Sequence, residues 1–389
     1  MPSPTREPGA DVIVVGGGVM GCASAYALAR RGARVVVLER SVPGAEASSA
    51  AAGMLGAQSE SHAPGPFASL SIASRERFGR WAEELRDATG IDVEHRACGI
   101  LQVAHDERGA DELARTAAWQ RAEGFEAELL DARDALAKEP SLGEGVVAGL
   151  HFPRDGRIDP PRLLRALRVA AERAGVRFQS GTYVKRVAAA EGRARGVELE
   201  GGALLEAEHV VVAAGSWSTL VAGVPLASDA VRPARGQIVE LVLPAPVTRG
   251  VISASSVYLS PRDDGRVLVG STLEFVGYER ATTAGAIRDL LTAATRAIPA
   301  LERADFSRAW SSFRPHTAHG LPYIGRSSIE RVWLATGHFR NGILLSPITA
   351  EIIAALVSGE APPVELAPFE APRACSPPFV DGNETSGRP

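Results

Sequence analysis

The sequence contains few cysteines. Cys22, Cys98 and Cys375 are the only three among 389 residues, and no two of them form a CxxC pair. An odd number of widely separated thiols argues against a disulfide-built scaffold, and the missing pairs argue against a zinc site or a dithiol redox centre. We therefore expect no metal site, and a reducing, cytoplasmic compartment.

An excess of basic charge is also missing. The formal net charge is −4 and the isoelectric point is about 6.1. A protein that binds nucleic acid or an anionic membrane through a basic field would have the opposite balance. We expect a small-molecule substrate, no nucleic-acid partner and no membrane partner. The sequence leaves a homo-oligomer open.

Targeting and membrane segments are not expected either. The start, MPSPTREPGA, lacks the basic and apolar regions of a signal peptide. Residues 12–29 carry no charge over 18 positions, which is near the length of a membrane span. However, this stretch includes Gly16, Gly17, Gly18 and Gly21, and each glycine costs a helix roughly 1 kcal/mol. A strand, a glycine turn and a short helix fit it better. We found no internal repeats.

The clearest motif lies in residues 11–40, DVIVVGGGVMGCASAYALARRGARVVVLER. Apolar runs at 11–15 and 34–38 are typical of buried parallel strands, with an alanine-rich helix between them. Gly16, Gly18 and Gly21 have GxGxxG spacing, which allows a tight turn, close backbone approach to a pyrophosphate, and close helix packing. Glu39 follows the second strand, where a carboxylate can accept a hydrogen bond from a ribose. The stretch predicts a dinucleotide site.

A second near match, GEGVVA at 143–148, follows no predicted strand and is discounted. Glu39 would repel a 2′-phosphate, so the dinucleotide is expected to be NAD or FAD. The loop at 41–55, SVPGAEASSAAAGML, has small side chains that would let backbone lie along an extended ligand. A surface loop is the alternative interpretation.

Several elements are expected downstream. Leu70, Phe78, Trp81 and Leu85 predict a buried helix over residues 67–87. Asp159 and Pro160 predict the start of a helix that ends at Gly175. Residues 109–139 are expected to form a solvated helical surface. Further helices are expected at 284–298 and from 342 to about 357, and strands at 92–104, 176–179, 183–187, 195–199, 209–218 and 331–337.

Residues 231–272 alternate between apolar and polar positions and contain turn residues, which predicts an antiparallel sheet. The predicted fold class is α/β, more fully an α+β two-domain protein with a discontinuous Rossmann-like domain. We expect the nucleotide-binding domain to comprise residues 1–88, 145–225 and 315–365. The antiparallel-sheet substrate domain is expected to comprise 89–144 and 226–314. A disordered tail is expected over 366–389, which is rich in proline, serine and charge.

Five stretches together resemble the D-amino-acid oxidase-like superfamily of FAD-dependent amine oxidases. They are SSAAAGMLGA (48–57), RGQIVEL (235–241), VYLSPRDDGRVLVGST (257–272), RPHTAHGLPYIGR (314–326) and ATGHFRNGILLSPITAEI (335–352). Within that superfamily the chain most resembles the glycine-oxidising branch that feeds thiazole formation in thiamine synthesis. The resemblance covers residues 11 to about 357. It implies non-covalent FAD, because the related enzymes that attach flavin use a cysteine, and none occurs between Cys98 and Cys375.

The resemblance also implies site residues. Glu39, Arg40, Val19 and Met20 would hold the adenosine half of FAD, and Val184 would touch the adenine. The loop after Glu39 would run along the pyrophosphate and ring, and residues 338–344 would wrap the isoalloxazine. With the glycine motif, the expected cofactor-binding residues are Gly16, Gly18, Val19, Met20, Gly21, Glu39, Arg40, Ala47, Ser48, Ala52, Gly53, Met54, Val184, Ala214, Gly215, His338, Phe339, Arg340, Asn341, Gly342, Ile343 and Leu344.

Arg314 is the expected anchor of the substrate carboxylate, since a guanidinium offers two parallel donors to it. Tyr258 is expected beside it as a hydroxyl donor, although a packing role in a strand is the alternative. Arg340 is expected to lie at the flavin edge. We expect no catalytic base, because hydride transfer to flavin removes no proton from carbon; His316, His319 and His338 are interpreted as packing or hydrogen-bonding residues.

Three positions depart from the family pattern on the substrate side. His319 stands where relatives often have an acid, Ser256 where some have histidine, and Leu273 where methionine can occur. The implied reaction oxidises glycine, sarcosine or small D-amino acids with O2, giving an imine, then glyoxylate and ammonia, and H2O2. Two alternatives remain: a D-amino-acid dehydrogenase that uses another electron acceptor, and a non-enzymatic flavin-binding subunit of tRNA modification.

Overall fold

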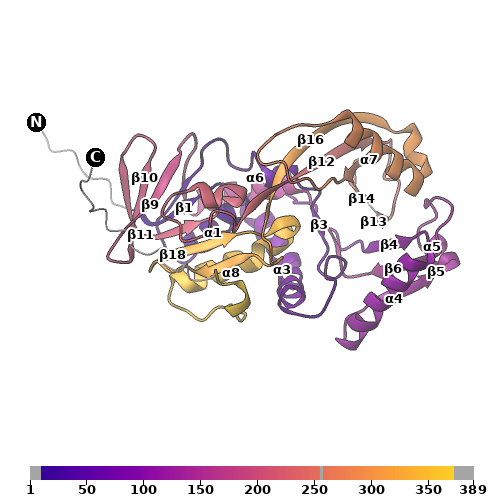
Figure 1. Ribbon diagram of the computed structural model, residues 1–389, viewed down its shortest axis with the longest axis horizontal. Coiled ribbons are helices and arrows are strands. Elements are labelled where there is room, and N and C mark those ends of the chain that lie inside the picture. The colour runs from indigo at the N-terminus through magenta and orange to yellow at the C-terminus, as the bar shows by residue number, and fades with distance from the viewer. Residues whose placement is uncertain (1–9, 255–256, 372–389) are drawn as a thin grey trace, which may run out of the picture.

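The computed structural model describes residues 10–254 and 257–371, and two large sheets lie side by side along its long axis (Figure 1). The first sheet has the order β17-β18-β11-β1-β2-β8, with β9 and β10 joined to it through β11. The pairs β1–β2, β1–β11, β11–β18 and β2–β8 are parallel. Its strands are β1 (Ala10–Val15), β2 (Val35–Leu38), β8 (Arg177–Gln179), β9 (Val184–Ala190), β10 (Arg193–Leu199), β11 (Leu204–Val212), β17 (Tyr323–Arg326) and β18 (Val332–Thr336).

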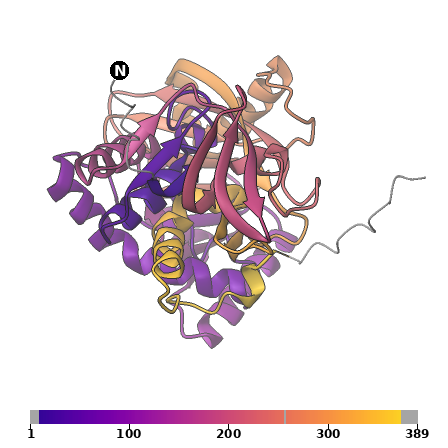
Figure 2. The same cartoon turned by 90° about the vertical axis from the view of Figure 1, so that its left-hand side faces the viewer.

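Apolar helices pack beside this sheet. Strands β1 and β2 are buried along nearly all of their length, as expected for a parallel sheet covered on both faces. Figure 2 views this end of the molecule, with the pink β9–β10 strands toward the reader and the yellow C-terminal helix below them. The helices that share a core with this sheet are α1 (Val19–Ala29), α3 (Pro66–Thr89), α6 (Pro160–Arg173) and α8 (Gly342–Val357).

The second sheet has the order β16-β12-β15-β14-β13-β4-β6-β5 and is antiparallel except for the β13–β4 pair. It lies on the right in Figure 1. Its strands are β4 (Ile100–Ala104), β5 (Glu128–Asp131), β6 (Ala148–Phe152), β12 (Arg232–Val242), β13 (Val251–Ala254), β14 (Val257–Pro261), β15 (Arg266–Gly270) and β16 (Asp305–His316). Its helices are α4 (Glu107–Ala122), α5 (Ala132–Lys138) and α7 (Ala284–Ala297).

Short elements complete the fold. A two-stranded ribbon pairs β3 with β7, and a one-turn helix, α2, precedes it. These elements are α2 (Ala47–Ala50), β3 (Met54–Leu55), β7 (Gly156–Arg157), η1 (Gly215–Leu220), η2 (Pro299–Arg303), η3 (Phe339–Asn341) and η4 (Ala367–Phe369). The predicted α/β class, with one mainly parallel and one mainly antiparallel sheet, is confirmed.

One stretch of the described chain, Phe339–Val357, is long and apolar enough to cross a membrane. Within the fold, 72% of its 18-residue window is buried. It includes α8, which packs against α1 and α3, so its apolar character is accounted for by the core of this domain.

Several sequence-based expectations are wrong in detail. The helical surface expected over 109–139 contains β5, and β6 was not expected at all. The strand expected over 92–104 begins only at Ile100. Strand β6 is bonded into the second sheet, although the predicted boundary at 145 assigns it to the nucleotide-binding domain. Strand β16 was also missed, because its first half is exposed and polar and gives a weak apolar pattern.

The predicted start of disorder at 366 is also wrong. Leu366 is 8% exposed and Phe369 is 3% exposed, and both belong to the core around α8. The expectation for 372–389 lies outside the described residues. The remaining domain boundaries stay a prediction.

Candidate active site

A long cavity runs from the carboxyl ends of β1 and β2 to the second sheet. Its lining comes from both halves of the chain: the glycine turn, the 46–54 loop, residues 213–217, β12, β14, β16 and the turn before α8. In an open parallel sheet, ligands bind at the carboxyl ends of the strands. The cavity therefore lies where the fold favours a bound dinucleotide.

The glycine turn has the close packing that its spacing predicts. Gly16 has a φ of 106°, and a Cβ there would lie 2.6 Å from the Ala213 carbonyl oxygen. A Cβ on Gly21 would overlap the Gly16 carbonyl oxygen, so helix α1 can approach the turn only with glycine at this position. A Cβ on Gly18 would meet only the Ser48 hydroxyl, at 3.2 Å, so this side of the turn is open toward the loop and cavity.

The first turn of α1 offers backbone donors beside that open side. The amide of Val19 donates to Ser48 Oγ at 3.0 Å, and Gly18 is the N-cap residue without a side-chain cap. Glu39 lies at the end of β2 and accepts hydrogen bonds from the amides of Gly17, at 2.8 Å, and Ser41, at 2.9 Å. A helix N-terminus attracts phosphate, and the glycine cradle leaves room for it.

Side chains from the second sheet and its turn hold the 46–54 loop through hydrogen bonds to the loop's carbonyl groups. The Ala52 carbonyl accepts from Arg262 Nη2 at 2.6 Å and from Ser260 Oγ at 3.2 Å. The Ala50 carbonyl accepts from the indole of Trp310 at 3.0 Å. These bonds orient the small-residue loop along the cavity.

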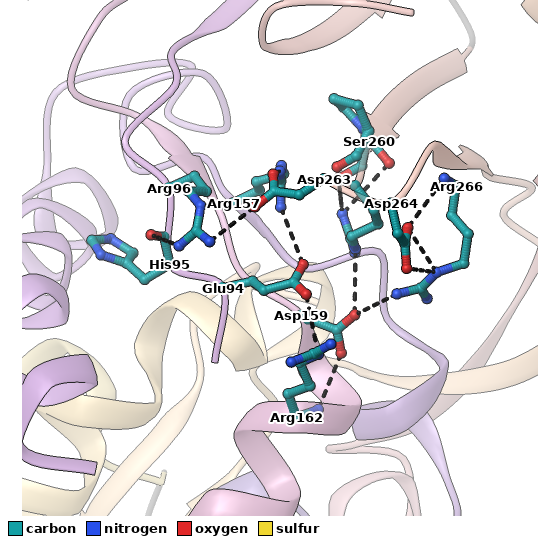
Figure 3. A network of polar contacts seen from close by, with 12 residues as sticks. Glu94, His95, Arg96, Arg157, Asp159, Arg162, Ser260, Asp263, Asp264 and Arg266 are labelled. Atoms are coloured by element: carbon teal, nitrogen blue, oxygen red, sulfur yellow. Dashed lines mark hydrogen bonds and ion pairs between the residues drawn. The ribbon is translucent and has the colours of Figure 1, made fainter. Parts of the chain in front are cut away.

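Arg262 is fully buried and belongs to a charged network at the junction of the two sheets. Its Nε lies 3.6 Å from Asp159. Asp159 also caps α6 by accepting from the Arg162 amide (Figure 3). Burial lowers the pKa of Arg262 to about 10, so it keeps its charge at neutral pH. The predicted cap at Asp159 is thus present, and it also links helix α6 to the loop of the cavity.

At the other end, Arg314 and Tyr258 lie against glycines. A Cβ on Gly236 would overlap the Arg314 guanidinium, and one on Gly270 would overlap the Tyr258 hydroxyl. Arg314 Nη1 donates to the Thr272 carbonyl at 3.1 Å and Nη2 to Ser271 Oγ at 2.5 Å. Burial lowers the pKa of Arg314, an effect that Tyr258 and Glu60 oppose and Arg340 reinforces. A guanidinium held in this way is preorganised for an anion.

Arg340 and His338 come from the turn that leads into α8. Arg340 Nη2 donates to Glu60 Oε1 at 2.8 Å, and its side chain is 44% exposed. His338 Nε2 lies 3.1 Å from the Thr349 hydroxyl, and burial lowers the pKa of His338 to about 3. His338 is therefore neutral at physiological pH, in agreement with a hydrogen-bonding rather than an acid–base role.

The cavity brings together most of the predicted site residues. The lining includes Arg314, Tyr258 and Arg340, and all of the expected cofactor-binding residues except Gly21 and Leu344. Gly21 acts through packing behind the turn. Leu344 is fully buried in the core, because it follows Ile343 by one residue on a helix and so faces away from the cavity.

The positions that depart from the family pattern are less central. His319 Nδ1 accepts from the Leu321 amide at 3.0 Å, and Leu273 is 52% exposed. His316 packs edge-on against Phe339, with ring centroids 4.9 Å apart. Neither His319 nor Leu273 is among the described residues that line the cavity, and His316, which is not one of the departing positions, does not line it either. Ser256 lies outside the described residues.

Sequence reasoning missed several lining or supporting residues. Trp217 and Gly236 line the cavity, and Glu60 pairs with Arg340. Arg262 does not line the cavity but donates a hydrogen bond to the Ala52 carbonyl of the 46–54 loop. Glu60 lies just beyond the SSAAAGMLGA stretch, and Gly236 and Arg262 lie inside quoted stretches, but only the three-dimensional arrangement distinguishes them from neighbouring charges and small residues. Among the described residues, no group of three or more His, Cys, Asp or Glu side chains could hold a metal ion.

Comparison with known proteins gives a consistent result. The family model described as "DAO: FAD dependent oxidoreductase" matches residues 11–356. A protein named glycine oxidase from Geobacillus kaustophilus (strain HTA426) is 37% identical over 366 residues, which is 93% of this chain and 97% of that protein. The crystal structure of glycine oxidase from Geobacillus kaustophilus superimposes with a TM-score of 0.89, at 37% identity, covering 94% of this chain and 98% of that one.

A second kind of relative is longer than this chain. The "Bifunctional protein ThiO/ThiG" of Synechocystis sp. (strain ATCC 27184 / PCC 6803 / Kazusa) is 38% identical over 355 residues. The match covers 89% of this chain but 51% of that protein. The chain therefore corresponds to about half of that relative.

Proposed function

The chain belongs to the DAO family of FAD-dependent oxidoreductases, and we propose that within this family it oxidises glycine and small amines such as sarcosine or small D-amino acids. It is an FAD-dependent amine oxidase. The position of Arg314 is the observation that supports this choice of substrate. Its guanidinium packs against Gly236, and Arg314 and Tyr258 line the cavity at the end opposite to the glycine turn.

The described residues fit FAD. The cradle at Gly18, the amides at the start of α1, and the fastened 46–54 loop would hold the pyrophosphate. Glu39 would accept from the ribose, and Val184 would contact the adenine. Residues 338–343 would surround the ring. FAD held by these residues would supply the acceptor for a hydride from the α-carbon of the amine.

Arg314 would bind the substrate carboxylate through two parallel hydrogen bonds, with Tyr258 adding a third donor. This contact fixes the position of the α-carbon, which is the main contribution that a protein makes to such a transfer. Arg340, at the edge of the ring site, would stabilise negative charge that develops there. The products would be an imine, which hydrolyses to glyoxylate and ammonia, and H2O2 from O2.

Oxygen uptake tests this proposal. The purified, yellow protein is supplied with glycine, sarcosine, D-alanine and D-proline, with and without an artificial electron acceptor, and H2O2 is measured. We expect uptake of O2 with at least glycine or sarcosine. Reduction of the acceptor without uptake of O2 would support the alternative, a D-amino-acid dehydrogenase. A yellow protein inert toward all four amines under both conditions would reject both.

The relatives named ThiO/ThiG motivate a proposed context for the reaction. The imine or glyoxylate from glycine would supply thiazole formation in thiamine synthesis. A cytoplasmic location would accord with that role.

A further inference from the structure

A buried ion pair, Arg262 with Asp159, contacts the 46–54 loop without lining the cavity. The two residues are 0% and 3% exposed, and neither is among the described residues of the cavity wall. The Ala52 carbonyl accepts the shorter of its two described side-chain hydrogen bonds, 2.6 Å, from Arg262 Nη2. A buried guanidinium in this place does more than hold the loop, because its charge also acts over a distance.

The positive member of the pair is the one that contacts the loop. Arg262 Nη2 donates to Ala52, and Nη1 donates to Ser260 Oγ at 2.9 Å. The described contacts of the Asp159 carboxylate are with Arg262, with Arg266 and with the first turn of α6. Because the Nε of Arg262 lies 3.6 Å from Asp159, the carboxylate neutralises the guanidinium only in part.

The Ala52–Gly53 peptide group transmits this charge toward the cavity. In a trans peptide the C=O and N–H bonds point in opposite directions. The Ala52 carbonyl points at Arg262, so the N–H of Gly53, a residue of the cavity wall, points away from it. A cation bonded to the carbonyl polarises the peptide and strengthens the N–H as a donor. The Gly53 carbonyl is itself held by the Ile158 amide at 2.9 Å, which fixes the orientation of the group.

Hydride transfer adds charge at the place where the hydride is accepted. A hydride carries two electrons and one proton, so its acceptor gains one negative charge. A positive charge and a backbone donor that are fixed in advance stabilise such a charge without reorganisation. Arg262 is fully buried, so dissolved ions screen its charge little.

We propose that Arg262 is a positioning residue that acts on bound FAD through the Ala52–Gly53 peptide and favours the reduced form over the oxidised form, and that Asp159 moderates this effect. The inference rests on the proposed function in placing FAD along the 46–54 loop. It does not depend on which amine is oxidised. The buried pair thereby controls the reduction potential of the flavin, whereas Arg314 binds the substrate.

The preference for reduced FAD, defined as the ratio of the dissociation constants of oxidised and reduced FAD, tests the proposal. It is obtained by equilibrating the FAD-loaded protein with a reference dye in the absence of oxygen and comparing the result with free FAD. A tenfold change in this preference corresponds to about 30 mV in the two-electron potential. No amine is added, so the measurement does not depend on activity.

The two members of the pair should shift the preference in opposite directions. Arg262→Gln keeps a donor for Ala52 but removes the charge, and should lower the preference for reduced FAD about tenfold. Asp159→Asn retains a side chain that can cap α6 and leaves Arg262 less neutralised, so it should raise the preference about threefold. A purely structural role would not give opposite signs.

An exposed ion pair supplies matched controls. Arg288 and Asp289 of α7 have side chains that are 75% and 68% exposed. Arg288→Gln and Asp289→Asn make the same two charge changes and should leave the preference within about twofold of wild type, since solvent screens exposed charges. Ser260→Ala removes the other hydrogen bond to the Ala52 carbonyl but keeps Arg262, and should also stay within about twofold.

The proposal is overturned if Arg262→Gln changes the preference no more than Arg288→Gln does, or if Asp159→Asn shifts it in the same direction as Arg262→Gln. Should Arg262→Gln fail to fold, the comparison of Asp159→Asn with Asp289→Asn decides, and equal preferences overturn the proposal. A failure of the cofactor placement is seen separately with Gly18→Val, whose side chain would occupy the open side of the glycine turn. Unchanged affinity for oxidised FAD in that variant would reject the site itself, and with it the proposed function.

Discussion

The two ends of the cavity are built in different ways. The phosphate cradle at the nucleotide end comes from one continuous stretch, β1–α1–β2, whose glycines and Glu39 lie within 24 residues of each other, 16–39. The substrate end combines Glu60, Tyr258, Arg314 and Arg340, which come from four separate parts of the chain. At the first end backbone amides and close packing prevail, and at the second end charged side chains prevail. Substitutions at the nucleotide end should therefore lower FAD affinity, whereas substitutions at the substrate end should lower kcat/KM and leave FAD bound.

The largest effect is expected at the substrate end. Arg314→Ala should lower kcat/KM for the preferred amine by about 10²–10³-fold, because two hydrogen bonds to a charged group are lost. FAD should remain bound. Arg314→Lys should also be impaired, since an ammonium cannot replace the planar fork. Steady-state kinetics and the flavin-to-protein absorbance ratio measure both effects.

The control for Arg314 is Arg288→Ala, which removes an exposed arginine of α7 whose partner, Asp289, is also exposed. It should leave kcat/KM within about twofold of wild type. Equal kcat/KM for Arg314→Ala and the control would remove Arg314 as the anchor. Loss of flavin in Arg314→Ala would show that FAD binding also depends on the substrate end of the cavity.

The next effect is expected at the nucleotide end. Gly21→Ala would force a methyl group into the Gly16 carbonyl oxygen, and such overpacking costs about 1–3 kcal/mol. The dissociation constant for FAD should rise by about 10- to 100-fold, measured by titrating the stripped protein. The matched change Gly79→Ala, in helix α3 with nothing within 4 Å, should leave FAD affinity unchanged. Equal FAD affinity in both variants would contradict the packing role of Gly21.

A third prediction concerns how the stability of the protein depends on pH through His338. The folded protein holds His338 at a pKa of about 3, whereas an unfolded chain has a histidine pKa of about 6.5. The unfolded state therefore binds more protons below pH 6.5, and the contribution of neutral His338 to stability is lost as the pH falls toward 3. From pH 7 to pH 5 the loss is about 2 kcal/mol.

The comparison that isolates this residue is wild type against His338→Gln, by chemical denaturation at both pH values. The wild-type free energy of unfolding should fall by about 2 kcal/mol more than that of the variant. Equal decreases in the two proteins would mean that His338 titrates normally in the folded state.

The smallest effect is expected for Glu39→Gln. The variant keeps an oxygen acceptor but loses the charge, and a neutral hydrogen bond to the ribose is weaker than a charge-assisted one. FAD affinity should fall about two- to fivefold, measured by the same titration. A loss of a hundredfold would indicate that the carboxylate does more than bond the ribose and the amides of Gly17 and Ser41.

The same contrast explains what the sequence could predict. The glycine turn, its helix and Glu39 are adjacent in the chain, so local physics predicts their arrangement, as it predicts the cap at Asp159. Arg314 and Tyr258 could be selected only through family resemblance, because a lone arginine in a strand has no local signature. Glu60 and Arg262 were missed for that reason: their partners, Arg340 and the Ala52 carbonyl, lie 280 and 210 residues away in sequence.

Strands β5 and β6 were missed because they are short, have a mixed composition and lie next to helices. The pairing of β6 with β4 and of β5 with β6 decides their conformation. Leu344 was predicted to bind the cofactor because it belongs to the same sequence motif as Ile343. A helix points successive side chains about 100° apart, which is why Leu344 lies in the core and not in the cavity lining.

The central claim is that one cavity holds FAD at the glycine turn and an amine at Arg314. The most direct test is to mix the FAD-loaded protein with glycine or sarcosine in the absence of oxygen and to follow the flavin absorbance. We predict that the yellow colour bleaches in the wild-type protein and returns when air is admitted, and that Arg314→Ala stays yellow at the same amine concentration. A wild-type spectrum that both amines leave unchanged would contradict the account.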